Sequence, residues 1–191
     1  MNNKYKKIKV CSFDVDGTLT DGVYDINEHG LITKSFYTRD FYGIELLIKA
    51  GIKVIIITSS KDNVIEKRIE RLKDGNIFWH ETLNANNQLM IKTGCRNKKK
   101  FMEEVFKVQN IAHKDNQLSF DNLAHMGDAE NDLECIKLAR FSGCPTDAIP
   151  DVRTIAMYPS DYYGGKGAVH DFCMYIIEQR NKELSNENSE S

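Results

Sequence analysis

Carboxylate and hydroxyl side chains stand directly after the short apolar runs of this sequence. Each run is typical of a buried strand, and in an open parallel sheet ligands bind beyond the carboxyl ends of the strands. These polar side chains should therefore gather at one edge of the sheet. They are Asp14, Asp16 and Thr18 after the first run, Thr58, Ser59 and Ser60 after the second, and Asp128 and Asp132 after a third.

The chemistry of such a group is that of a metal-assisted phosphate site. Three converging carboxylates repel one another unless a cation or shared protons compensate them, and an all-oxygen site suits Mg²⁺. A hydroxyl at a helix start and a lysine ammonium commonly hold phosphate oxygens, and the sequence offers the cluster Lys98, Lys99 and Lys100. The set predicts magnesium-dependent phosphate transfer. An Asp-x-Asp pair alone is more often a turn or helix cap, and Thr58 could also cap the helix that follows it.

The elements that must position these residues alternate between strands and helices. Four consecutive apolar residues, Val54 to Ile57, indicate a strand buried on both faces. This alternation predicts an α/β fold with a mostly parallel sheet flanked by helices. The predicted strands are Ile8–Val15, Lys53–Thr58 and Asn122–Met126, with a weaker Ile77–Trp79 and a possible edge strand Thr154–Met157; the predicted helices are Phe41–Ala50, Asp62–Leu72, Phe101–Val108, Ala129–Ala139 and Ala168–Glu178.

One segment interrupts the alternation. Val23–Ile26 and Leu31–Tyr37 flank the tetrad NEHG, in which Gly30 can adopt positive φ, so we expect a β-hairpin over about residues 22–38. The remainder predicts a single domain over residues 1–180. Residues 181–191 carry almost nothing apolar and are expected to form a disordered polar tail.

The composition limits the kinds of partner that this protein is expected to bind. The 26 basic and 28 acidic residues of the 191 nearly cancel, so no strong field favours nucleic acid or an anionic membrane. No apolar stretch is long enough to span a bilayer or to serve as a signal peptide, so we expect a cytoplasmic protein. The five cysteines are odd in number and lack any CxxC pair, which predicts reduced thiols in or near the core.

Four motifs in order resemble those of the haloacid dehalogenase (HAD) superfamily of phosphohydrolases. They are FDVDGTLT at Phe13–Thr20, ITS at Ile57–Ser59, a lysine, and GDAEND at Gly127–Asp132. LTDG at Leu19–Gly22 with its hairpin, GCRNK at Gly94–Lys98, PTDA at Pro145–Ala148 and GGKGAVHDF at Gly164–Phe172 resemble the small-cap branch that contains 3-deoxy-D-manno-octulosonate 8-phosphate and acylneuraminate 9-phosphate phosphatases. The resemblance covers residues 8–178, with insertions near 75–93 and 113–121, and implies a Rossmann-like fold with a hairpin cap.

The resemblance also implies roles for individual residues. Asp14 would be the nucleophile and Asp16 the general acid and base. The metal Mg²⁺ would bind Asp14, Asp128 and the backbone carbonyl of Asp16. Asp132 would support these ligands without touching the metal, or would bind the metal through a water molecule. Phosphate would be held by Thr58 and Lys98, the latter preferred over Lys100 from the motif spacing, and the rest of the substrate would meet Ser59, Asn131 and Lys166.

The substrate is less well specified. The related phosphatases carry Gly-Arg where Ser59-Ser60 stands and arginine where His170 stands, and those arginines would grip a sugar-acid carboxylate. A phosphorylated sugar acid is the first expectation; another sugar phosphate, a nucleotide or a nucleic-acid end is the alternative. A non-catalytic oligomerisation module is a third reading. The branch further implies a homotetramer, and the segment Gly164–Gly167 is either a plain loop or a contact to the substrate, one that could reach a neighbouring active site.

Overall fold

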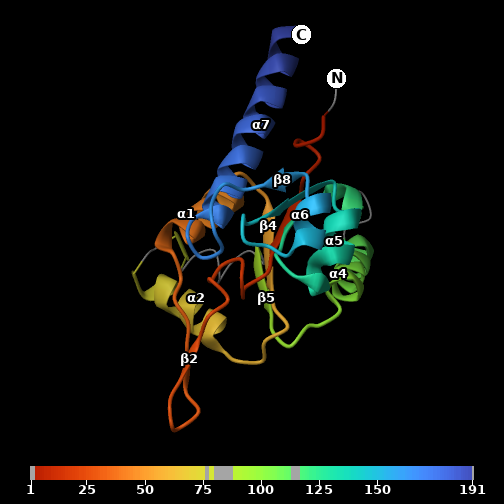
Figure 1. Ribbon diagram of the computed structural model, residues 1–191. Coiled ribbons are helices and arrows are strands. Elements are labelled where there is room, and N and C mark those ends of the chain that lie inside the picture. The colour runs from red at the N-terminus through yellow and green to blue at the C-terminus, as the bar shows by residue number, and fades with distance from the viewer. Residues whose placement is uncertain (1–2, 76–77, 80–87, 113–116, 191) are drawn as a thin grey trace.

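A six-stranded parallel sheet forms the centre of the molecule. A computed structural model describes residues 3–75, 78–79, 88–112 and 117–190 (Figure 1). The strands run in the order β5-β4-β1-β6-β7-β8, and every described pair is parallel. Their bounds are β1 Val10–Phe13, β4 Lys53–Ile57, β5 Leu89–Lys92, β6 Leu123–Met126, β7 Phe141–Cys144 and β8 Tyr158–Pro159. The predicted α/β class and parallel sheet are confirmed.

Helices cover both faces of this sheet (Figure 1). One face packs against α1 Thr38–Lys49, α2 Val64–Gly75 and α7 Ala168–Glu190; the other packs against α4 Lys98–Ala112, α5 Leu133–Leu138 and α6 Pro150–Ile155, with short 3₁₀ turns η1 Phe120–Asn122 and η2 Glu130–Asp132. Along β1, Cys11 and Phe13 belong to the first core and Val10 to the second. Successive side chains of a strand point to opposite faces, so both faces of β1 are buried.

The predicted hairpin is present and projects from the body of the molecule (Figure 1). Strands β2 Asp25–Ile26 and β3 Ile32–Thr33 pair antiparallel in a separate two-stranded sheet. The Asn27 side chain accepts hydrogen bonds from the backbone N–H groups of His29 and Leu31, and Gly30 has φ of 75°. The NEHG tetrad therefore closes the hairpin through local side-chain chemistry.

Two strand predictions are wrong. Ile77 lies outside the described residues, but Phe78 and Trp79 are helical, and the edge strand is instead β5, inside a segment predicted to be an insertion. Thr154–Met157, expected as a possible edge strand, is not one: α6 occupies residues 150–155, and Pro150 suits the first turn of that helix. The chain reaches the sheet only at β8.

One strand has no signal in the sequence. The residues of β7, Phe-Ser-Gly-Cys, lack the β-branched pattern of a buried strand. Gly143 is required there because a Cβ at this position would lie 2.6 Å from the Phe172 ring of α7.

The end of the chain also differs from the prediction. Residues 181–190, expected to be disordered, continue α7 as a helix. The Glu183 carboxylate accepts hydrogen bonds from the backbone N–H groups of Tyr5 and Lys6, which ties this helix to the start of the chain. The five cysteines are all free and buried, as predicted. Among the described residues, none of the helices combines the length and apolar character that crossing a membrane requires.

Candidate active site

The ends of two adjacent strands, β1 and β6, bring the predicted carboxylates together. Asp14 directly follows β1, which lies between β4 and β6, and its backbone N–H bonds the Met126 carbonyl at 3.0 Å. Asp128 follows β6. One carboxylate oxygen from each of Asp14, Asp128 and Asp132 lies within 4.8 Å of the others, a spacing that could hold a metal ion. The sheet-edge expectation is therefore met by the geometry.

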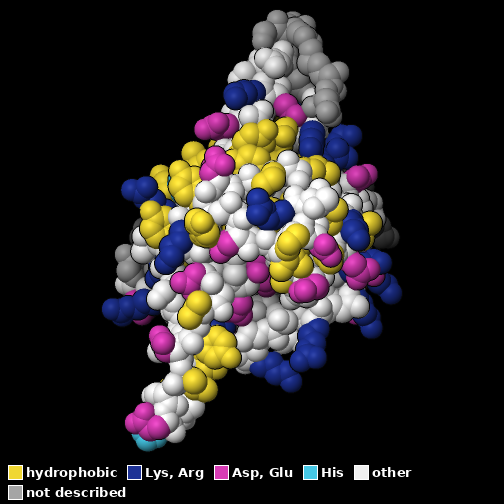
Figure 2. Space-filling model, viewed as in Figure 1, with side chains coloured by type: hydrophobic (Ala, Val, Ile, Leu, Met, Phe, Trp, Pro, Cys, Tyr) yellow, Lys and Arg dark blue, Asp and Glu magenta, His cyan; other side chains and the backbone are white. Residues whose placement is uncertain are grey.

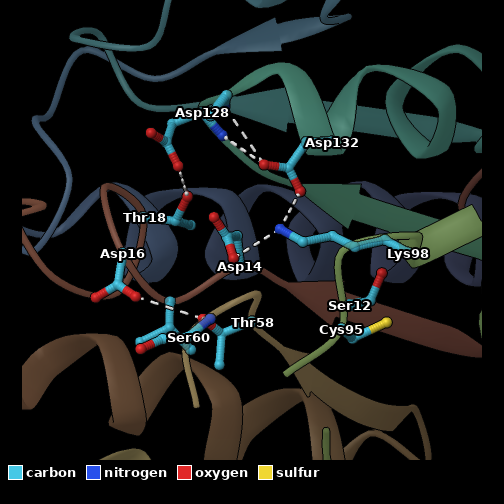
Figure 3. Close-up of polar contacts among 12 residues, drawn as sticks. Ser12, Asp14, Asp16, Thr18, Thr58, Ser60, Cys95, Lys98, Asp128 and Asp132 are labelled. Carbon is cyan, nitrogen blue, oxygen red and sulfur yellow. Dashed lines mark hydrogen bonds and ion pairs between the residues drawn. The ribbon is translucent and has the colours of Figure 1, made fainter. Parts of the chain in front are cut away.

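Lys98 is the lysine that reaches this group. Its ammonium is fully buried and lies 2.6 Å from Asp14 Oδ1 and 2.7 Å from Asp132 Oδ1 (Figure 3). Lys99 instead pairs with Glu134 at 3.4 Å, and Lys100 is exposed. Burial separates the first lysine of the triplet from the other two, because a buried ammonium requires charged partners.

Asp132 is held by four donors. Its Oδ1 accepts from Lys98 and from His125 Nε2 at 2.9 Å, and its Oδ2 accepts from the backbone N–H groups of Asp128 at 3.3 Å and Ala129 at 3.4 Å. Burial alone would raise the pKa of Asp132, but the charge of Lys98 and the His125 hydrogen bond lower it to about 2. Asp132 therefore remains ionised, and its oxygens are occupied by protein donors.

The pKa values of the other two carboxylates, Asp14 and Asp128, are shifted in the opposite direction. Burial raises the pKa of Asp14 well above its usual range, and the charge of Asp132 adds to this effect while Lys98 opposes it. Burial and Asp132 also raise the pKa of Asp128 to about 6. Carboxylates with raised pKa values bind protons unless a cation takes the place of those protons. The all-oxygen donor set fits Mg²⁺, with Asp14 and Asp128 as the groups that would hold it.

Two motif glycines allow the carboxylates to approach. Gly17 has φ of 86°, and a Cβ there would lie 2.1 Å from Asp128 Oδ2. A Cβ at Gly127 would lie 2.1 Å from the Asp132 Cγ atom. The backbone at both positions occupies space next to a site carboxylate, which gives a steric reason for glycine in the DGT and GD motifs.

A buried serine and histidine support the site, and sequence reasoning did not assign them a role. Ser12 of β1 lies opposite His125 of β6 in the strand register, with Ser12 Oγ 2.7 Å from His125 Nδ1. Burial lowers the pKa of His125, so the ring is neutral and donates from Nε2 to the ionised Asp132. The sequence does show a polar residue inside an otherwise apolar strand. Such a residue is expected to have a hydrogen-bond partner, but the sequence does not identify that partner.

The cap adds a cation that the sequence analysis also missed. Asp16 Oδ1 lies 2.7 Å from Lys34 Nζ, and Asp16 Oδ2 accepts from Thr58 Oγ1 at 3.4 Å. Thr18 Oγ1 donates to Asp128 Oδ1 at 3.1 Å (Figure 3). The predicted hydroxyls and acid/base carboxylate thus lie at one polar site, with a lysine of the hairpin beside them.

The predicted substrate residues are more dispersed. Ser59 is exposed, the buried Asn131 Oδ1 has no hydrogen-bond partner among the described residues, and Lys166 lies 3.6 Å from Asp21. Lys166 also lines a pocket of about 240 Å³. Its other lining residues are Tyr37, Arg39, Tyr162, Gly167, His170, Asp171 and Met174.

The glycine-rich segment packs on this chain's own motif loop. Gly165 N–H donates to the Thr18 carbonyl at 2.9 Å, and a Cβ at Gly164 would lie 2.0 Å from the Gly17 carbonyl oxygen. Residues 164–165 therefore support the loop that carries the carboxylates, and the close backbone contact requires glycine.

Comparisons with known proteins agree with this geometry. No protein-family model matches the chain. The curated N-acylneuraminate cytidylyltransferase of Oncorhynchus mykiss is 28% identical over 186 residues, which are 96% of this chain but only 38% of that enzyme. The chain thus spans about two fifths of the length of this curated relative.

Two solved structures match over most of their length. A 3-deoxy-D-manno-octulosonate 8-phosphate phosphatase from Moraxella catarrhalis, in complex with a magnesium ion, a phosphate ion and a KDO molecule, is 26% identical and covers 100% of this chain and 99% of its own, with a TM-score of 0.77. A protein from Legionella pneumophila described as a HAD superfamily (subfamily III A) hydrolase is 32% identical and covers 94% of this chain and 87% of its own, also with a TM-score of 0.77. This chain therefore belongs to the HAD superfamily.

Proposed function

We propose that this chain is a Mg²⁺-dependent phosphomonoester hydrolase that acts through an aspartyl-phosphate on Asp14. One observation carries the proposal: the Asp14 carboxylate lies at the sheet edge, bonded through Oδ1 to the buried Lys98 and within metal-sharing distance of Asp128. Magnesium, when bound at Asp14 and Asp128, supplies positive charge beside the phosphoryl oxygens. The match to a phosphatase that binds magnesium and phosphate supports the same reaction.

The first step transfers the phosphoryl group to the protein. An Asp14 oxygen forms a bond to phosphorus while the bond from phosphorus to the leaving oxygen breaks. Asp16 gives its proton to that oxygen, so the leaving group departs as a neutral alcohol and Asp16 becomes a carboxylate. Lys98 and the Thr58 hydroxyl offer positive charge and a hydrogen bond to the phosphoryl oxygens as negative charge shifts among them.

The second step returns the protein to its starting state. A water oxygen attacks phosphorus, the bond from Asp14 to phosphorus breaks, and the water proton passes to Asp16. Inorganic phosphate leaves, Asp14 is again a carboxylate, and Asp16 is again protonated. Both steps use the same two carboxylates, which lie at the end of one strand and in the loop after it.

For the substrate we propose a phosphorylated sugar acid of the 3-deoxy-octulosonate 8-phosphate or acylneuraminate 9-phosphate type. The Moraxella catarrhalis phosphatase with bound KDO supports this class. Arg39 and Lys166 in the pocket near the start of α7 are cations that could receive a carboxylate, and His170 lines the same pocket, although Lys166 is exposed and pairs with Asp21.

A phosphate-release screen tests the proposal. Sugar-acid phosphates, other sugar phosphates, nucleotides and 3′-phosphorylated oligonucleotides are each incubated with Mg²⁺ and either the wild type or Asp14→Asn. Asparagine keeps the shape of the side chain but cannot form the aspartyl-phosphate, so phosphate release is expected from the wild type alone. Equal release from both proteins would end the enzymatic proposal.

A second candidate is a non-catalytic module of a larger protein. The partial match to a cytidylyltransferase favours it, since 186 residues of that enzyme align with this chain. The buried ion pairs of Lys98 with Asp14 and Asp132 speak against it, because a scaffold gains little from buried charges that cost free energy to desolvate. The screen above separates the two candidates.

We also propose a homotetramer in which neighbouring hairpins supply the cover of the site. The hairpin exposes four large apolar side chains, Val23, Tyr24, Ile26 and Leu31, each more than half accessible. Figure 2 shows hydrophobic side chains on the projecting part of the molecule. Such a surface on one hairpin suits burial against another chain. Sedimentation should give a tetramer at micromolar concentration, and a stable monomer would contradict this assembly.

A further inference from the structure

Lys34 is a cation of the hairpin whose side chain is buried. It directly follows β3, where both neighbours in the chain, Thr33 and Ser35, are exposed. Its own side chain is only 3% exposed, and its ammonium lies 2.7 Å from Asp16 Oδ1 and 2.7 Å from Asp62 Oδ2. Lysine is almost never buried without partners, and here both partners are carboxylates.

Asp62 provides a fixed anchor for this lysine. Its Oδ2 also accepts a hydrogen bond from Ser60 Oγ, and its Oδ1 accepts from the backbone N–H of Val64 at 3.1 Å, at the first residue of α2. Burial works against both charges, yet the hydrogen bonds to Asp16 and Asp62 raise the pKa of Lys34, and those from Lys34, Ser60 and Val64 lower the pKa of Asp62. Both groups stay charged at neutral pH, and the start of α2 fixes the position of the ammonium.

The contact with Lys34 fixes the orientation of the Asp16 side chain. Asp16 is one third exposed and lies in the loop after β1. Lys34 holds Oδ1, and Oδ2 is left on the side of the Thr58 hydroxyl. Thr58 belongs to the proposed phosphate site, so Oδ2 is the Asp16 oxygen that lies on the side of that site.

We propose that Lys34, anchored by Asp62, is a positioning residue that holds Asp16 with Oδ2 turned toward the leaving group. This inference rests on the proposed function, in which Asp16 carries a proton on Oδ2 while Oδ1 accepts from Lys34, and gives that proton to the leaving oxygen as the bond from phosphorus to that oxygen breaks. Lys34 itself gains and loses nothing in the step. It links the cap to the acid that the reaction uses.

The dependence of the rate on the leaving group tests this role. The value of kcat/KM reports events up to departure of the leaving group, so it contains the proton transfer but not the later hydrolysis of the aspartyl-phosphate. An alkyl phosphate needs that proton because an alkoxide is a poor leaving group, whereas p-nitrophenyl phosphate can leave as a weakly basic phenolate. Positioning of Asp16 should therefore matter for alkyl esters and little for the aryl ester.

Four variants make the comparison specific. Lys34→Gln should lower kcat/KM for alkyl phosphates by about 10²-fold, the lower end of general-acid contributions, and for p-nitrophenyl phosphate by only a few-fold. Asp16→Asn should show the same pattern at larger amplitude. Asp62→Asn retains an acceptor for the Val64 N–H and should show a weaker form of the pattern. Lys67→Gln removes an exposed lysine of α2 that pairs with Glu70, and kcat/KM should stay unchanged for both ester types.

The outcomes separate the two proposals. Equal losses on both ester types in Lys34→Gln, with the wild type active, would assign Lys34 a structural role and overturn this inference alone. Recovery of the alkyl-ester rate in Lys34→Arg, which keeps the cation, would support it further. A wild type that releases no phosphate from either ester, like Asp14→Asn, would overturn the proposed function and this inference together.

Discussion

Replacement of Gly17 by alanine should displace one metal-binding carboxylate with little other change. An ideal Cβ at this position lies 2.1 Å from Asp128 Oδ2, and side-chain carbons essentially never approach another heavy atom closer than 3.0 Å. The difference of those two distances means that the carboxylate, or the loop that carries residue 17, must move by about 0.9 Å. The clash is with the Asp128 carboxylate itself, so the proposed metal site takes up the displacement.

The expected loss follows from that displacement. Metal ligands tolerate errors of only about 0.2 Å, and a misplacement of about 1 Å in a catalytic group can cost about 10²-fold in rate. Asp128 would also lose the hydrogen bond from Thr18. We expect Gly17→Ala to lower kcat by about 10²-fold and to raise the Mg²⁺ concentration for half-maximal activity by about tenfold or more. A separate cost of about 1–2 kcal/mol comes from the positive φ of 86°.

Gly51→Ala is the matched control. Gly51 has φ of 77°, but no heavy atom of the described residues lies within 4 Å of the Cβ position. Its variant should lose the same 1–2 kcal/mol of unfolding free energy while keeping the wild-type rate and Mg²⁺ dependence. Phosphate release titrated with Mg²⁺ and urea unfolding measure the two effects. Wild-type kinetics in Gly17→Ala, or an equal kinetic loss in both variants, would refute the reasoning.

Three further predictions use the same assays. Lys98→Met leaves two buried carboxylates without their cation and should cost about 3–5 kcal/mol in urea unfolding with loss of phosphate release, whereas Lys99→Met, which breaks an exposed pair, should cost less than about 1 kcal/mol and stay active. Ser12→Ala leaves the buried His125 Nδ1 unpaired and should cost about 1–3 kcal/mol in the same measurement; no change would mean that the pair contributes nothing to folding. Burial raises the pKa of Asp128 to about 6 in the folded, metal-free protein. Protonated Asp128 therefore stabilises the fold at pH values below the ordinary carboxylate pKa, and this contribution is lost as the pH rises through about 6. Because Mg²⁺ needs the carboxylate, the increase in Tm on adding Mg²⁺ should be larger at about pH 7.5 than at about pH 5, and an equal increase would contradict this assignment.

The central part of the site was predictable because one rule of α/β folds applies to it. Polar residues at the ends of neighbouring parallel strands must share an edge, so Asp14, Thr58 and Asp128 could be grouped without any knowledge of side-chain contacts. Lys98 was singled out by the motif spacing, and the structure adds the physical difference between it and Lys100: only the first is buried against carboxylates.

The contacts that the sequence did not predict are those between distant segments. The strand that contains His125 was predicted, but the bonds of His125 to Ser12 and Asp132 depend on the strand register and on the position of the η2 turn. Lys34 gave even less signal, since a lysine on a hairpin is usually solvated. Its burial follows from the position of the cap relative to Asp16 and Asp62, which no local periodicity reports.

The charges of the site imply an order of binding. Asp132 stays ionised beside the buried ammonium of Lys98, so without Mg²⁺ the edge of the sheet has no net positive charge, and it becomes negative as Asp14 and Asp128 ionise. A phosphate dianion would be repelled by that charge, and a divalent cation neutralises it. The second cation, Lys34, is shared between Asp16 and Asp62 and leaves no excess positive charge for the phosphate. Magnesium should therefore bind before phosphate, and phosphate should raise the Tm only when Mg²⁺ is present.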